Sequence, residues 1–147
     1  MRPKASSTGF NSHMKELIQI IYISSSKELL DEDQLCELSS SFSRNNEEHG
    51  ITGLLLYKDG SFMQVIEGEK LNIEQLYFNI EKDTRHSGVV QLIKESIAQR
   101  QFPEWSMAVK HIPPEKNPEF SDFFVSNNAN ATLGHMAKTL LKSFKNV

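Results

Sequence analysis

A glutamine among apolar residues is the feature of this chain that points most directly to chemistry. Gln64 stands in the run 62–67, which follows an Asp-Gly turn signal. Counting with period two places Gln64 on one face of a predicted strand with Phe62 and Ile66. A buried amide costs roughly 1–3 kcal/mol for each polar group left unpaired. Gln64 is therefore expected either to brace the core or to bind a ligand.

Polar residues also gather where the two predicted helices end. Asn45 and Asn46 close the first helix, where asparagine either caps a turn or contacts a ligand. Asp83, Arg85 and His86 follow the second helix. Because a helix dipole disfavours a carboxylate at its C-terminus, Asp83 is expected to accept hydrogen bonds from neighbouring backbone or from Arg85.

Three aromatic or sulfur side chains complete the candidates. Tyr22 lies within a predicted strand, where its phenol is either a core group satisfied locally or a redox and hydrogen-bonding group aimed at a ligand. Trp105 and Met107 share one face of the last predicted strand and fit core packing by default.

The first half of the chain predicts a strand, a helix and a hairpin. Residues 17–24 form a short isoleucine-rich run typical of a buried strand. Asp31 with Gln34 three residues later indicates a capping box, and the helix that follows extends to about Glu48. The apolar stripe of this helix is formed by Leu35, Leu38 and Phe42, and Gly50 is a fitting stop.

The second half adds a helix and two strands. Asp59-Gly60 predicts a hairpin between strands 51–58 and 61–67. Apolar residues then recur at helical spacing up to about Asp83, and strands are expected at 89–97 and 105–110. The order β-α-β-β-α-β-β predicts an α+β, ferredoxin-like sandwich with a mixed sheet, two helices on one face and a groove between them.

The 147 residues are predicted to form one domain with extensions at both ends. Residues 1–13 are interpreted as an added leader, with Met14 as the natural start. Residues 14–110 are the domain, and 111–147 are a helical C-terminal extension. Its apolar stripe, which is expected to dock on the sheet or on another subunit, is formed by Leu133, Met136, Leu140 and Phe144.

Composition argues against several classes of partner. The net charge of −3 and a sequence pI near 5.9 offer no broad attraction to nucleic acid. No apolar run reaches the roughly 20 residues that span a bilayer, so no membrane partner and a cytoplasmic location are expected.

The single Cys36 is predicted to be a small buried hydrophobe, and no Cys/His spacing indicates a metal. His49 and His111 are interpreted as surface residues without partners.

An ordered set of segments resembles one known family. The segments are Ile21-Tyr22-Ile23-Ser24-Ser25, residues 44–57, Asp59 to Glu69, Asp83-Thr84-Arg85-His86 and Phe102 to Met107. From about Lys15 to about Lys110 the chain closely resembles the BLUF family of blue-light sensors that use FAD. The resemblance implies a photoreceptor with no catalytic output domain, a downstream regulatory protein as partner, and a homo-oligomer.

The resemblance also implies roles for individual residues. Tyr22 matches the photoactive tyrosine, which gives up an electron and then a proton, and Gln64 matches the glutamine that relays it. Gln64 then rearranges by rotation or tautomer change, donates to the flavin C4 carbonyl and shifts the absorption to the red. Asn46 matches a flavin-binding asparagine, and Asn45 the adjacent contact.

The remaining implied roles concern the cofactor's tail and the output. The region of Asp83, Arg85 and His86 approaches the ribityl side of the flavin, while Trp105 and Met107 transmit the signal. Asn79 replaces a basic residue of several relatives, so FMN or riboflavin is expected to compete with FAD. Two rivals stay open: a light-independent ferredoxin-like ligand-binding or protein-interaction domain, and a small acyl-phosphate hydrolase, which lacks support because no Gly-rich anion loop precedes either helix.

Overall fold

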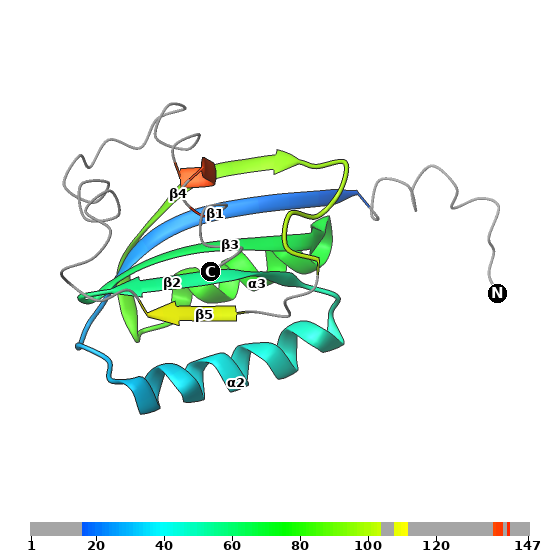
Figure 1. The fold of residues 1–147 in the computed structure, drawn as a ribbon. Coiled ribbons are helices and arrows are strands. Elements are labelled where there is room, and N and C mark those ends of the chain that lie inside the picture. Colours follow the sequence, from blue (N-terminus) through cyan, green and yellow to red (C-terminus); the bar gives the residue numbers. More distant parts are fainter. Residues whose placement is uncertain (1–15, 104–107, 112–136, 140, 142–147) are drawn as a thin grey trace, which may run out of the picture.

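One five-stranded sheet organises the protein (Figure 1). The computed structural model describes residues 16–103, 108–111, 137–139 and 141. Within these residues the strands lie in the order β4-β1-β3-β2-β5. In chain order the elements are β1 (Leu17–Ser26), α2 (Glu32–Glu48), β2 (Thr52–Lys58), β3 (Ser61–Glu69), α3 (Lys70–Lys82), β4 (His86–Ser96) and β5 (Ala108–His111).

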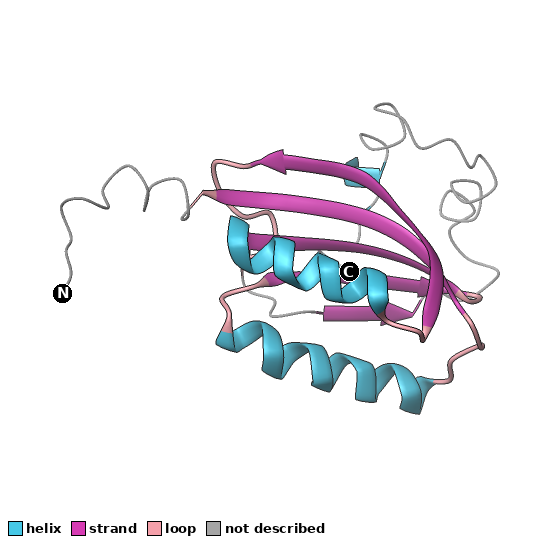
Figure 2. Cartoon of the chain, turned by 180° about the vertical axis from the view of Figure 1, so that it is seen from behind, coloured by secondary structure: helices cyan, strands magenta, loops and turns pink. Residues whose placement is uncertain are grey.

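The topology confirms the predicted α+β, ferredoxin-like arrangement. β1 pairs antiparallel with β3 and β4, β2 pairs antiparallel with β3, and β5 lies parallel to β2, so the sheet is mixed. Figure 2, seen from behind, shows that α2 and α3 both lie on one side of the sheet, with α3 across its centre. This side is called the helix face below, and the opposite side is called the far face.

Local signals set the ends of α2. The Asp31 carboxylate accepts from the backbone N–H of Gln34 at 2.8 Å, and the Gln34 side chain accepts from the backbone N–H of Asp31 at 2.9 Å. This reciprocal pair is the predicted capping box. After Glu48 the chain reaches Gly50 with φ +64, a conformation that suits glycine and stops the helix.

The tight turn between β2 and β3 fixes their register. Asp59 and Gly60 have φ values of 49 and 84, so both central residues adopt the left-handed conformation that a two-residue hairpin favours. Lys58 therefore pairs with Ser61, and the strands continue from there. This register places Gln64 on the helix face, as the alternation predicted.

Alternation divides the apolar residues between two cores, one on each side of the sheet. The helix-face core buries the following side chains: Ile18, Ile20, Tyr22, Leu35, Ile51, Leu55, Tyr57, Phe62, Ile66, Ile73 and Ile80. The far-face core buries Ile21, Ile23, Leu54, Leu56, Met63, Val65, Phe102, Ala137 and Leu141. The sheet is thus covered on both sides, and its two faces can carry different tasks.

The C-terminal region is described only in part. Residues 137–139 and 141 are helical, and Ala137 and Leu141 are buried in the far-face core. The leader and the stripe residues Leu133, Met136, Leu140 and Phe144 lie outside the described residues, so the predicted boundaries of the extensions stay predictions. Among the helices that are described, none has the length and apolar character needed to cross a membrane.

Candidate functional site

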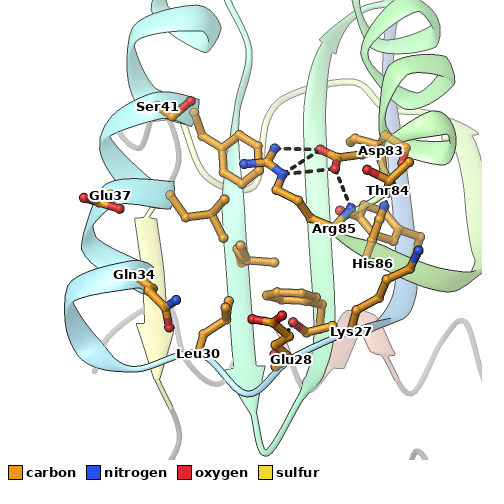
Figure 3. Close-up of a pocket in the computed structure, with 17 residues that line it drawn as sticks. Lys27, Glu28, Leu30, Gln34, Glu37, Ser41, Asp83, Thr84, Arg85 and His86 are labelled. Atoms are coloured by element: carbon orange, nitrogen blue, oxygen red, sulfur yellow. Dashed lines mark hydrogen bonds and ion pairs between the residues drawn. The ribbon is translucent and has the colours of Figure 1, made fainter.

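A cleft of about 590 Å³ opens on the helix face between α2 and the residues that follow α3. Its walls include apolar side chains from the sheet, such as Leu55 and Phe62, and from α2, such as Phe42. Charged side chains, including Lys27 and Arg85, line it as well (Figure 3). This volume lies within the roughly 300–1,000 Å³ of sites that take small molecules or cofactors.

Tyr22 and Gln64 form a hydrogen-bonded pair beside this cleft. They face each other across β1 and β3, and their side chains are only 3% and 1% exposed. The Tyr22 hydroxyl donates to Oε1 of Gln64. Burial raises the pKa of Tyr22 above its ordinary value, and the nearby Tyr77 and Asp83 add to the effect. Tyr22 is therefore a neutral phenol whose proton already points at the glutamine.

Asp83 and Arg85 form a second pair at the cleft (Figure 3). Arg85 Nη2 lies 2.6 Å from Asp83 Oδ2, and Arg85 Nε donates to both carboxylate oxygens at 3.0 and 3.1 Å. The Asp83 carboxylate also accepts from the Arg85 backbone N–H at 2.9 Å. The side-chain hydrogen bonds from Arg85 hold the pKa of Asp83 below its usual range. The expected explanation for a carboxylate at this helix end is confirmed.

His86 is oriented by two partners that the sequence did not reveal. Its Nε2 lies 2.7 Å from the backbone oxygen of Ile80, and its Nδ1 lies 2.8 Å from the hydroxyl of the buried Ser24. A carbonyl can only accept, so Nε2 carries a proton. Because both ring nitrogens have protein partners, His86 presents its ring rather than a free nitrogen to the cleft, edge-on to Tyr22 at a centroid distance of 6.4 Å.

The two asparagines differ in their surroundings. Asn46 is 1% exposed, and its backbone oxygen accepts from His49 and Ile51, which joins the end of α2 to the start of β2. Asn45 is exposed, and its backbone oxygen lies 2.8 Å from His49 Nδ1. The described cleft lining contains Tyr22, Asp83, Arg85 and His86 but neither asparagine, and Gln64 reaches it through Tyr22.

Several expectations from the sequence need correction, and two concern residues outside the described part of the chain. Cys36 is exposed rather than buried, because it lies on α2 beside the apolar stripe and faces away from the sheet. His111 does have a partner: its Nδ1 lies 2.5 Å from Glu32 Oε2, 79 residues away in sequence. His49 also has a partner in the backbone of Asn45. Trp105 and Met107 lie outside the described residues.

Sequence reasoning missed four buried polar residues, Gln19, Ser24, Lys58 and Glu67. Ser24 could have been found, since it has the same parity as Tyr22 on β1 and therefore faces the same core. Glu67 was visible only as a far-face residue, yet its carboxylate is fully buried. Among the described residues no group of three or more histidine, cysteine, aspartate or glutamate side chains is arranged to hold a metal ion.

Comparison with known proteins places the cleft in a family. Residues 17–108 match the model of the BLUF family, described as sensors of blue light using FAD. A photoactivated adenylate cyclase subunit beta from Euglena longa is 34% identical over 71% of this chain, which covers 12% of that protein. A blue light- and temperature-regulated antirepressor from Escherichia coli is 31% identical over 48% of this chain, which covers 18% of it.

Solved structures show the same likeness over more of the chain. The dark-state structure of BlrB, a BLUF protein, has a TM-score of 0.71 at 26% identity, covering 89% of this chain and 99% of that one. The photo-activated state of BlsA has a TM-score of 0.69 at 27% identity, covering 89% and 96%. The chain therefore spans nearly the whole of these short proteins, but only about an eighth of the curated cyclases.

Proposed function

The chain belongs to the BLUF family of flavin-binding blue-light sensors, and on this basis we propose that the Tyr22–Gln64 pair is its light-driven switch. The observation that carries the proposal is the hydrogen bond from the Tyr22 hydroxyl to Gln64 Oε1, formed by two buried side chains beside the cleft. If Gln64 only braced the core, neither a phenol donor nor a neighbouring cleft would be required.

The cleft suits a flavin in size and in chemistry. The flavin ring is planar and aromatic with a polar edge, and the cleft combines apolar walls with a few polar side chains. Gln64, Asn46 and the adjacent Asn45 would hold the polar edge of the ring. Asp83, Arg85 and His86 would lie toward the ribityl side, where the Asp83–Arg85 pair lines the cleft.

Tyr22 and Gln64 have the properties that the switch requires. When bound, a flavin supplies the absorption of blue light and the electron-accepting chemistry. Tyr22 is the electron and proton source, and its neutral, buried hydroxyl donates to Gln64 Oε1, which is therefore placed to take the proton. Gln64 offers donors and an acceptor in one planar group, so it can rearrange by rotation or tautomer change and keep a different set of hydrogen bonds.

The cofactor is proposed to be FAD, with FMN and riboflavin as competitors. Asn79 is exposed, and its side chain accepts from Gln75 at 3.3 Å. It carries no charge that could attract a cofactor phosphate. Arg85 also lines the cleft, but Asp83 neutralises its charge. The phosphate groups therefore gain little from this part of the site, and FMN and riboflavin are expected to compete with FAD.

The signal is proposed to leave through a downstream regulatory protein or a change in homo-oligomer state. Similar proteins are effectors of different kinds by name, a photoactivated adenylate cyclase subunit in one case and an antirepressor in another. Trp105 and Met107 are proposed to transmit the signal, because they precede β5 at the edge of the sheet. A light-driven change can bias a partner only by the free-energy difference between the dark and lit states.

An absorption experiment tests the proposal. The purified protein, loaded separately with FAD, FMN and riboflavin, is measured in darkness, after blue light and during return to darkness. We expect a small red shift that recovers without bleaching. Bound flavin that never shifts would contradict the switch, and failure to bind any flavin would favour the light-independent ligand-binding or interaction domain.

A further inference from the structure

A buried carboxylate on the far face holds the chain that leads toward β5. Glu67 is 0% exposed, although it is a carboxylate, and it lies on β3 on the same face as the apolar residues Val65 and Met63. Burying a charge is costly unless hydrogen bonds compensate for the lost water. The contacts of Glu67 supply this compensation, and they come from a segment that is distant in sequence.

Four donors converge on the Glu67 carboxylate, and the most distant is the Thr52 hydroxyl, 3.5 Å from Oε1. Oε2 accepts from the Gln101 backbone N–H at 2.8 Å and from Gln19 Nε2 at 2.9 Å, and Oε1 accepts from the Phe102 backbone N–H at 2.9 Å. Arg100 Nη1 adds a bond of 3.0 Å to the backbone oxygen of Glu67. Residues 100–102 are therefore fastened to β3, and Phe102 fills the far-face core.

The fastening point shares its two strands with the proposed switch. Across β1 and β3, Gln19 pairs with Glu67 and Tyr22 pairs with Gln64, so the two pairs are three residues apart along the same ladder. The switch pair faces the helix-face core, whereas the fastening pair faces the far side. A displacement of β3 relative to β1 at one pair must move the other, because the strands are continuous.

We propose that Glu67 is a positioning residue that couples the rearrangement of Gln64 to residues 100–102, an inference that rests on the proposed function. Its hydrogen bonds from Gln19, Gln101 and Phe102 are 2.8–2.9 Å long, which is near the optimum for N–H···O bonds. Displacement in either direction therefore weakens them. Light loosens the hold of Glu67 on Gln101 and Phe102, so that these two residues are released from β3.

The hydrogen bonding around Glu67 leaves one buried acceptor, on Gln19, without a donor among the described residues. The Oε1 atom of Gln19 is buried and accepts no hydrogen bond from the residues that the structure describes. Buried acceptors in native proteins are paired in the great majority of cases. A core built only for stability would be expected to satisfy this group, whereas a switch benefits from a resting state that is not the best possible.

Hydrogen exchange in the flavin-loaded full chain tests the inference. The exchange of the Gln101 and Phe102 amides is measured in darkness and under continuous blue light, while the flavin absorption is recorded on the same sample. In the wild type we expect slow exchange in darkness and about tenfold faster exchange in light, the factor that corresponds to the loss of one charge-assisted hydrogen bond.

The variant Glu67→Gln separates coupling from packing. An amide keeps the size of the carboxylate but turns one acceptor into a donor, so it cannot accept from Gln101 and Phe102 together. We expect an unchanged red shift, fast exchange already in darkness at the amide that loses its acceptor, and no further effect of light on that amide. Glu74→Gln, which removes an ion pair with Lys94 at 2.8 Å on the helix side, is the control and should behave as the wild type.

The outcomes are distinguishable. A red shift in the wild type without any light-dependent change at Gln101 and Phe102 would overturn the inference and leave the proposed function intact, as would full dark protection of both amides in Glu67→Gln. If Glu67→Gln does not fold, Gln19→Met takes its place. It leaves both backbone bonds to Glu67 and is expected to keep dark protection while reducing the light effect at least about threefold. A wild-type light effect in this variant would refute the coupling.

Discussion

The two faces of the sheet use the same strands for opposite purposes. On the helix face, Tyr22 and Gln64 are neutral groups joined by one hydrogen bond beside a cleft. On the far face, the Glu67 carboxylate is held by donors from Gln19 and from the backbone of residues 101–102. A neutral amide can exchange its donors and acceptors at small cost, whereas a buried carboxylate cannot lose its donors cheaply. The comparison supports the proposal that the helix face carries the switch, while the far face holds residues 101–102 to the sheet.

The largest effect is expected from Gln64→Leu. Leucine removes the acceptor of the Tyr22 hydroxyl and every group that could be rearranged, so the persistent red shift should vanish while flavin stays bound. The measurement is the light-minus-dark absorption spectrum. Gln75→Leu, on the exposed side of α3, is the matched control and should keep the full shift. A normal light cycle in Gln64→Leu would refute the role of the glutamine.

The second largest effect is expected on the far face, where loss of the Glu67 carboxylate should lower the stability of the protein. Glu67→Leu leaves the Gln101 and Phe102 N–H groups and the Gln19 amide without their acceptor, at a cost of roughly 1–3 kcal/mol each. We expect the free energy of unfolding to fall by about 3 kcal/mol or more, measured by urea denaturation. Glu74→Leu should change the free energy of unfolding by less than about 1 kcal/mol, because the ion pair of Glu74 with Lys94 is partly exposed to solvent. Equal losses of stability in Glu67→Leu and Glu74→Leu would contradict the holding role of the Glu67 carboxylate.

Alkaline pH should reveal the burial of the switch. Burial raises the pKa of Tyr22 above 10.0, so the unfolded chain loses this proton before the folded protein does. Stability is unaffected below pH 10 and falls as the pH rises above it, by up to about 1.4 kcal/mol per unit. Tyr22→Phe lacks this contribution, while Tyr77, whose pKa burial raises to about 12, is common to both proteins.

Urea denaturation at pH 9, 10 and 11 measures the difference. The wild type should lose stability more steeply than Tyr22→Phe. Parallel curves would mean that the phenol ionises as readily in the folded protein as in the unfolded chain, which is incompatible with a buried hydroxyl bonded to Gln64.

The smallest effect is expected at the cleft rim. Asp83→Asn removes the paired carboxylate of Arg85, a partly exposed pair that is worth at most about 1 kcal/mol. Because Arg85 holds the pKa of Asp83 below 3.8, this contribution is present above pH 3.8 and is lost as the pH falls through the lowered pKa. Denaturation at pH 7 and at pH 3 measures it, and the two proteins should converge at the lower pH. A gap that widened on acidification would contradict the pairing.

The sequence predicted what is local and missed what depends on distant pairing. The capping box of Asp31 and Gln34, the Asp59-Gly60 turn and the facing of Gln64 each follow from residues close together in the chain. The sequence could not show that Tyr22 contacts Gln64, because that contact depends on the register of β1 and β3. It found the pair only through the family resemblance.

Buried polar contacts between remote segments were the main omission. Ser24 orients His86 from 62 residues away, and Glu67 binds backbone groups 34 and 35 residues away. Backbone donors have no signature in the residue types, so the role of Glu67 could not be read from the chain. Cys36 was misplaced because a cysteine beside an apolar stripe can fall on either side of its border.

The most direct test of the comparison is one light-minus-dark absorption experiment on three flavin-loaded proteins: the wild type, Tyr22→Phe and Glu67→Gln. Phenylalanine keeps the ring but removes the proton that Gln64 accepts, whereas Glu67→Gln alters only the far face. The account predicts a reversible red shift in the wild type, the same shift in Glu67→Gln, and none in Tyr22→Phe. A full shift in Tyr22→Phe would contradict the claim that this pair is the switch.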